Sequence, residues 1–189
     1  MEHPHPRQQW PRHCKGMIMF LHKVHALYNV VGKALTTEDL DKVRDIFDHE
    51  YGFDDFYRHD NRSPQEIWQE FTTSCQQLQK EFQSLTDPVS MYRAIAVPQI
   101  KDINLNAVGR HWTFDKKAAR CINKSKFTGQ VSTYYLQMNV PKDKVLWLES
   151  IARNISDPEE QEIVPREGEY TIDVYDSEWE PLTQVQGVV

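Results

Sequence analysis

The pattern of apolar residues changes abruptly at Thr86, Asp87 and Pro88, and this change constrains the fold more than any other feature. Before it, apolar residues recur every three or four positions, which is typical of helices. Ser63 is a strong helix start because Pro64 follows it and Glu66 completes a capping box. After Pro88 the pattern is typical of strands. The sequence therefore predicts an α+β protein, with a helical region at 1–87 and a strand-rich region at 88–189.

Within the first region we expect three helices. One covers residues 15–33, and a second begins near Thr37 as its cap. The third runs from Ser63 to the proline boundary, and residues 51–57 form an irregular, aromatic-rich connection. The second helix buries one face, made of Leu40, Val43, Ile46 and Phe47.

In the second region we expect strands at 89–97, 131–140, 144–148, 163–164 and 170–175. A turn or short helix is expected at 102–108 and a helix at 114–123. No repeat or low-complexity segment interrupts either region.

Composition excludes several classes of function. The 189 residues carry a net charge of −6, which argues against a general nucleic-acid binder. A basic segment at 110–126 could meet phosphates or be a solvated helix face. The longest apolar run, at 17–21, is too short to cross a bilayer, and residues 1–7 lack a signal-peptide pattern. We therefore expect a cytoplasmic protein without membrane contact.

The cysteine and histidine pattern predicts no metal site. Cys14, Cys75 and Cys121 are odd in number and widely spaced, so they indicate neither a disulfide framework nor a zinc motif. His22 and His25 are one helical turn apart but have no acid or cysteine at ligand spacing.

Two glutamates, Glu160 and Glu162, precede the apolar residues Ile163 and Val164. If this segment is a strand, Glu160 and Glu162 share a face because side chains alternate along it. Paired carboxylates suit a reaction in which positive charge develops and a nucleophile loses a proton. The alternative is a solvated acidic turn, which most E-x-E matches are.

Two further segments carry polar groups into apolar surroundings. Arg93 lies in an apolar strand and faces the same way as Met91, so it needs either a salt-bridge partner or an anion. His111 and Thr113 share a face if their segment is extended. A packed aromatic segment with two ordinary hydrogen-bonding side chains is the alternative.

In this order the three segments resemble the ADP-ribosyltransferase superfamily, in the branch marked by an arginine on a first strand, a Ser-Thr-Ser strand and an E-x-E motif. The resemblance covers residues 89–176 and is carried by three segments: Tyr92-Arg93-Ala94, residues 112–119 and residues 160–165. The sequence departs from the family where His111 and Trp112 replace the first Ser and the Thr. The resemblance implies a core of two facing, mainly antiparallel sheets with NAD in the cleft between them. The chain has no G-x-G-x-x-G motif, which agrees with that fold.

The resemblance also implies roles. Glu162 would contact the ribose hydroxyl beside the nicotinamide and stabilise the positive charge, and Glu160 would align or deprotonate the acceptor. Arg93 would hold the NAD phosphate or ribose, Thr113 would orient the catalytic glutamate, and His111 would contact the ribose. Tyr92 and Trp112 flank these positions and complete the expected cofactor-binding set.

The function that this resemblance implies is mono-ADP-ribosylation of a target protein with NAD as co-substrate, with arginine as the expected acceptor. Small phage-borne members, which modify host proteins or defence systems, are one subgroup that the chain could represent. The residues between Leu148 and Glu160 would form a loop that recognises the target. The helical region would cover the site or bind the substrate protein. Two alternatives stay open: an NAD glycohydrolase with the same site, and a non-enzymatic binding protein on a degenerate form of the fold.

Overall fold

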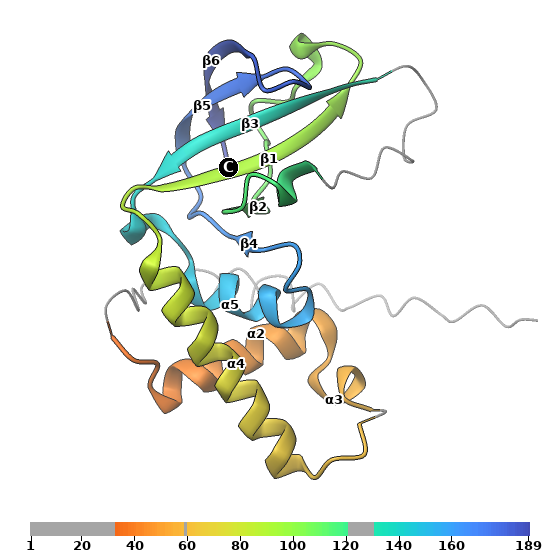
Figure 1. The fold of residues 1–189 in the computed structure, drawn as a ribbon, viewed down its shortest axis with the longest axis vertical. Coiled ribbons are helices and arrows are strands. Elements are labelled where there is room, and N and C mark those ends of the chain that lie inside the picture. Colours follow the sequence, from red (N-terminus) through yellow and green to blue (C-terminus); the bar gives the residue numbers. More distant parts are fainter. Residues whose placement is uncertain (1–32, 59, 121–130) are drawn as a thin grey trace, which may run out of the picture.

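The computed structural model describes residues 33–58, 60–120 and 131–189. The helix expected at 15–33, the pair His22 and His25, and the end of the helix expected at 114–123 lie outside these residues. The described chain is an α+β fold with a layer of helices below one antiparallel sheet (Figure 1). No helix in the described ranges is long and apolar enough to span a membrane.

Helices α2 (Thr37–Tyr51) and α4 (Pro64–Ser84) have the ends and faces that their sequences predict, apart from one cap. Ser63 and Glu66 form the expected capping box of α4. The cap of α2 is Thr36 rather than Thr37, since the Thr36 side chain and Asp39 form a capping box one residue earlier. Between them lies α3 (Phe53–Phe56), so the connection expected to be irregular contains a short helix.

The sheet has six strands in the order β4-β2-β1-β3-β5-β6, and every pair is antiparallel. The strands are β1 (Val89–Val97), β2 (Trp112–Thr113), β3 (Ser132–Val140), β4 (Glu162–Ile163), β5 (Glu169–Tyr175) and β6 (Pro181–Val188). The strands expected at 89–97, 131–140 and 170–175 are confirmed to within one residue. The expected pair of facing sheets is not confirmed, because the described strands form one continuous hydrogen-bonded sheet. Strand β6 was not predicted from the sequence.

The expected strand at 144–148 is wrong, as is the expected loop at 148–160. Residues 142–144 form a 3-10 turn, η4 (Lys142–Lys144), and the chain then forms helix α5 (Trp147–Ser156). Leu148, Ile151 and Ala152 are buried on α5, and this spacing is that of a helix face. The helix packs against α2, α4 and β4, so a helix of the second region completes the helical layer.

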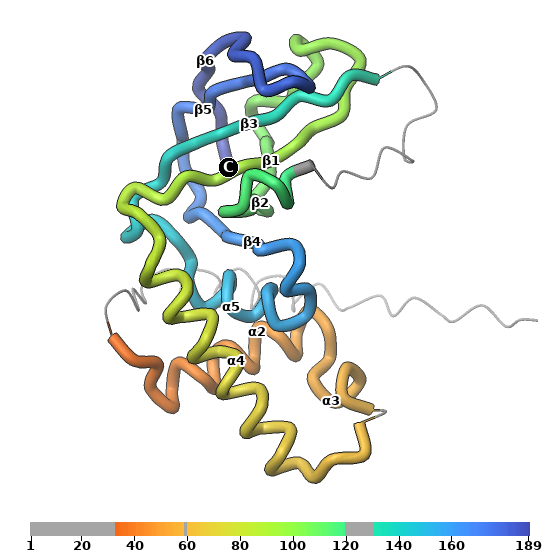
Figure 2. Tube along the Cα trace, in the orientation of Figure 1, coloured from red at the N-terminus to blue at the C-terminus, as the bar shows by residue number. Residues whose placement is uncertain are grey.

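The remaining connections are short. A 3-10 turn, η1 (Ile100–Asp102), begins the link between β1 and β2. A helix was expected at 114–123. In the described part of that range, residues 114–120, the helical structure is a second 3-10 turn, η2 (Ala118–Arg120). The trace in Figure 2 passes from α5 through β4 to β5, so β4 lies where the helical layer meets the sheet.

Candidate active site

Three adjacent strands carry the three segments that the sequence singled out. Glu162 pairs with Thr113 across β4 and β2, and Thr113 neighbours Tyr92 across β2 and β1. Residues opposite one another on antiparallel strands share a face, so these three side chains lie on one face of the sheet. Segments 20 to 50 residues apart in sequence are thus joined in one row.

Glu162 is 8% exposed, and one of its carboxylate oxygens has a close partner. Nδ1 of His111 contacts Oε1 of Glu162, and Nη1 of Arg153 lies 3.6 Å from the same oxygen. Oε2 makes no hydrogen bond to any residue that the structure describes. The carboxylate is therefore held through one oxygen, and the other can accept a hydrogen bond.

The backbone around Glu162 is fixed by helix α5. Oδ1 of Asn154 accepts a hydrogen bond from the Glu162 N–H at 2.9 Å, and Nδ2 of Asn154 donates to the Glu162 carbonyl. One turn earlier, Oγ of Ser150 accepts from the Val164 N–H at 2.9 Å. Because β4 is at the edge of the sheet, these side chains supply the bonds that a further strand would make.

Glu160 does not belong to the strand that carries Glu162, so the alternation argument for the pair is wrong. The residue lies in a turn after α5, and Gln161 has a φ of 46° before β4 begins at Glu162. The Glu160 side chain is exposed. Burial still raises its pKa, and the nearby carboxylates of Asp157 and Glu162 raise it further. Glu160 and Glu162 are electrostatically coupled despite the turn.

Arg93 points to the opposite face from Glu162. Its strand neighbour Tyr92 pairs with Thr113, so Arg93 lies on the face of Met91 and Trp112. Nη1 of Arg93 donates to the carbonyl of His111, and Nε is buried without a hydrogen-bond partner among the described residues. Burial lowers the pKa of the guanidinium, and the charge of Glu162 opposes that change.

A glycine makes room for this arginine. Gly109 has a φ of 94°, and a Cβ there would lie 3.1 Å from Nη2 of Arg93. Only glycine adopts this backbone conformation without strain and lets the guanidinium pass so closely. The link between β1 and β2 therefore folds around the Arg93 side chain.

The side chains of Trp112 and Thr113 both make hydrogen bonds to nearby backbone groups. Trp112 is 2% exposed in the core, and its indole N–H donates to the Gly109 carbonyl at 2.8 Å. Oγ1 of Thr113 accepts from the Asp115 N–H at 3.1 Å and starts the turn that follows β2.

Tyr92 lies beside an aromatic group at the far end of the same face. The ring of Trp179, in the hairpin between β5 and β6, stacks on Tyr135 with centroids 4.3 Å apart and meets Tyr92 edge-on at 6.0 Å. Nζ of Lys116 lies 4.0 Å from the centroid of the Trp179 ring. The Trp179 ring therefore covers the part of this face that carries Tyr92 and Tyr135.

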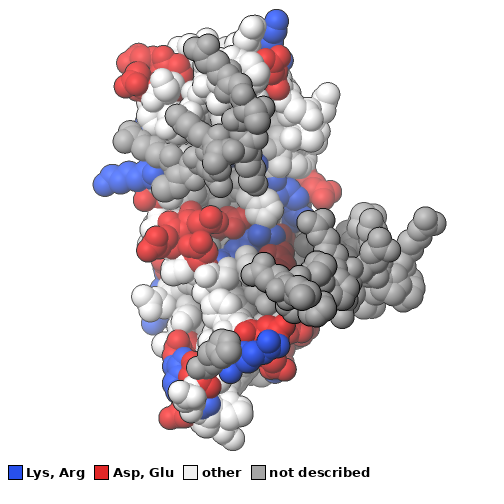
Figure 3. Space-filling model, turned by 90° about the vertical axis from the view of Figure 1, so that its right-hand side faces the viewer, with Lys and Arg blue, Asp and Glu red and all other residues white. Residues whose placement is uncertain are grey.

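Charged side chains gather where β4 meets α5. Figure 3 views the molecule from the side and shows acidic and basic side chains next to one another at mid-height. The ion pairs of this region join α2, α5, the link before β2, and β4: Glu50 with Arg153, Glu149 with Arg110 and Arg153, and Glu162 with His111 and Arg153. Sequence reasoning missed Glu50, Glu149 and Arg153, because nothing in their spacing relates them to Glu162. No group of three or more His, Cys, Asp or Glu side chains in the described ranges could hold a metal.

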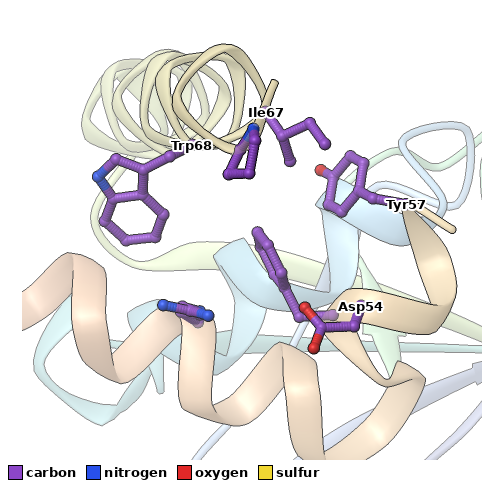
Figure 4. A pocket seen from close by; sticks show the side chains of 7 residues that line it. Asp54, Tyr57, Ile67 and Trp68 are labelled. Carbon is purple, nitrogen blue, oxygen red and sulfur yellow. The ribbon is translucent and has the colours of Figure 1, made fainter. Parts of the chain in front are cut away.

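A separate pocket lies within the helical layer, between α2, α3 and α4 (Figure 4). The guanidinium of Arg44 lies 4.8 Å from the centroid of Phe53 and 5.6 Å from that of Trp68. The pocket is lined by Arg44, Phe53, Asp54, Tyr57, Pro64, Ile67 and Trp68. None of these residues takes part in the ion pairs around Glu162.

Comparison of the chain with models of protein families, with curated proteins and with solved structures finds no match. The candidate site therefore stands on its geometry and on the sequence motifs alone.

Proposed function

We propose that the chain is a mono-ADP-ribosyltransferase that transfers ADP-ribose from NAD to a side chain of a target protein, with arginine as the favoured acceptor, and releases nicotinamide. The observation that carries the proposal is Glu162, a buried carboxylate with one oxygen held by His111 and the other open, in a row with Thr113 and Tyr92. We further propose that the single sheet is the core of an ADP-ribosyltransferase fold. In this proposal the helical region covers the site or recognises the target.

The open oxygen of Glu162 would accept a hydrogen bond from the ribose hydroxyl next to the nicotinamide. Its negative charge would stabilise the positive charge that develops at ribose C1′ as the bond to nicotinamide breaks. The bonding electrons leave with the ring nitrogen, whose positive charge is thereby neutralised. His111 and the α5 contacts hold the carboxylate still during this step.

Glu160 would act on the acceptor. A nitrogen of the acceptor arginine forms the new bond to C1′, and its proton passes to the Glu160 carboxylate. The raised pKa of Glu160 makes it a better base than an ordinary glutamate. Its exposed position on a turn suits a group that must meet a second protein.

Arg93 does not support an NAD contact in the same site. Its buried Nε–H has no partner among the described residues, but its side chain lies on the opposite face of the sheet from Glu162. His111 would contact the ribose while its Nδ1 stays with Glu162.

A second candidate is a non-enzymatic binding protein on the same fold. Its support is that His111 already occupies one oxygen of Glu162 and that Arg93 donates to the His111 carbonyl from the other face. Such a protein would bind a partner without consuming NAD.

The test is NAD cleavage and protein modification by the full chain, with Glu162→Gln and Glu160→Gln as variants. Glu162→Gln should lower NAD cleavage about a thousandfold or more, because the charge that stabilises C1′ is lost. A circular dichroism spectrum like that of the wild type should show that the variant is folded. Full NAD turnover by Glu162→Gln contradicts the proposal. NAD-independent binding of a lysate protein without any ADP-ribose mass addition favours the second candidate.

Glu160→Gln separates transfer from hydrolysis. Transfer to an arginine substrate should fall about a hundredfold, and NAD hydrolysis should fall much less. Because the base must be ionised, wild-type transfer should fall as pH drops through a value above the ordinary 4.5 of a glutamate. Equal losses of both reactions would assign Glu160 to bond cleavage instead.

A further inference from the structure

One arginine of α5 joins elements that are far apart in sequence. Arg153 is in the last turn of the helix, and its side chain is 13% exposed. Its Nη2 lies 2.7 Å from Oε1 of Glu50 on α2, and its Nη1 lies 3.6 Å from Oε1 of Glu162 on β4. The helical region and the candidate catalytic strand therefore meet at one guanidinium.

A buried carboxylate supports this arginine from within its own helix. Glu149 is one turn earlier on α5 and 3% exposed, and its Oε1 lies 3.8 Å from Nε of Arg153. Its Oε2 accepts from Nη2 of Arg110 at 2.9 Å. A buried charge persists in a protein when it is paired on more than one side. Glu149 thus links Arg153 to the segment that carries His111.

The arrangement acts on a single oxygen of Glu162. Arg153 and His111 both approach Oε1, which leaves Oε2 for a ligand. Negative charge is concentrated around the site, and a guanidinium at its centre offsets the repulsion. The charged and titratable groups that surround Arg153 and Glu162 are Glu50, Arg93, Arg110, His111, Glu149, Asp157 and Glu160.

We propose that Arg153 is a positioning residue for Glu162 and that Glu50 holds Arg153 in place. The helical region would then support bond cleavage directly, in addition to any role in target recognition. This inference rests on the proposed function, since it assigns Arg153 to the same reaction.

The test compares four variants of the full chain in steady-state NAD cleavage: Arg153→Met, Arg153→Lys, Glu50→Gln and the double variant Glu50→Gln with Arg153→Met. Arg153→Met should lower kcat about a hundredfold, because small misplacement of a catalytic group has effects of this size. The KM for NAD should change less than about twofold, as expected for a group that does not bind the substrate. Arg153→Lys should restore about a tenth of the wild-type kcat or more, because it keeps the charge.

Glu50 should act through Arg153. Glu50→Gln should lower kcat by a smaller factor, and the double variant should be no slower than Arg153→Met alone. Arg153→Met should also move the acidic limb of the pH–kcat profile to higher pH, since a nearby cation no longer favours ionised carboxylates. Arg58→Met serves as the control, because Arg58 forms an exposed pair with Asp55 in the helical layer.

A kcat within threefold of wild type in Arg153→Met, or additive losses in the double variant, would overturn the inference and leave the proposed function intact. Absence of NAD cleavage by the wild-type chain would instead overturn the proposed function. In that case a cycle of thermal midpoints with Glu162→Gln, Arg153→Met and their double variant still decides. Non-additive changes in the midpoint support the contact between Arg153 and Glu162, and additive changes refute it.

Discussion

The two edges of the sheet are built in opposite ways. Strand β4 has two residues, both buried, and α5 fills its outer edge with side-chain hydrogen bonds from Asn154 and Ser150. Strand β6 has eight residues, most of them exposed, and pairs with β5 along nearly its whole length. The candidate catalytic residue lies on the short strand. A strand need not be long or regular to hold a side chain firmly if a helix supplies its missing neighbours.

Asn154→Ala should break the β4 edge most severely. Both the N–H and the carbonyl of Glu162 lose a buried partner, which should cost about 2–4 kcal/mol of unfolding free energy. NAD cleavage should fall about tenfold or more as Glu162 loses its anchor. Gln186→Ala is the matched change on β6, where an exposed amide bonds Thr171, and it should stay within about 0.5 kcal/mol. Chemical denaturation measures both, and equal losses would contradict the comparison.

Ser150→Ala tests one bond of the same edge. The Val164 N–H is buried and would lose its acceptor, so the unfolding free energy should drop by about 1–2 kcal/mol. Gln184→Ala removes an exposed side-chain bond to Asp173 on the other edge and should have little effect. A Ser150→Ala variant as stable as wild type would mean that the Val164 N–H finds another partner.

The smallest expected effect concerns pH. Burial raises the pKa of Glu50 above 4.5, and this outweighs the opposing charge of Arg153. The folded state therefore holds this proton to higher pH than the unfolded state. The stability that the proton contributes is present below pH 4.5 and is lost as pH rises through the folded-state pKa. Glu50→Gln should flatten this decline in denaturation curves recorded from pH 4 to 7, whereas the exposed control Glu178→Gln should keep the wild-type slope.

The sequence predicts the parts of the fold whose patterns are local. Strands β1, β3 and β5 alternate or are continuously apolar, and Ser63 and Glu66 mark the start of α4. The failure at α5 has a physical reason. The apolar run from Val145 to Leu148 looks like a strand, but the chain turns into a helix within it, and only the later Ile151 and Ala152 reveal the helical spacing. Strand β6 was missed because its exposed glutamines and Pro181 lack strand character.

The candidate site was predictable in its parts and not in its connections. The order of Arg93, Thr113 and Glu162 along the chain pointed to three strands, and these strands are neighbours in the sheet. The contact of His111 with Glu162 depends on a diagonal across β2 and β4, which the sequence does not contain. The role proposed for Arg153 depends on how α5 packs, and residues of α5 were predicted as strand and loop.

His111 joins the two faces of the sheet. On the core side its carbonyl accepts from Arg93, and on the other side its ring contacts Glu162. A mutation in the packing around Arg93 would therefore reach the candidate catalytic carboxylate through one residue, without touching the site. If a core substitution near Gly109 lowers activity in a variant that remains folded, the cause would be a shift of His111 that moves the Glu162 carboxylate.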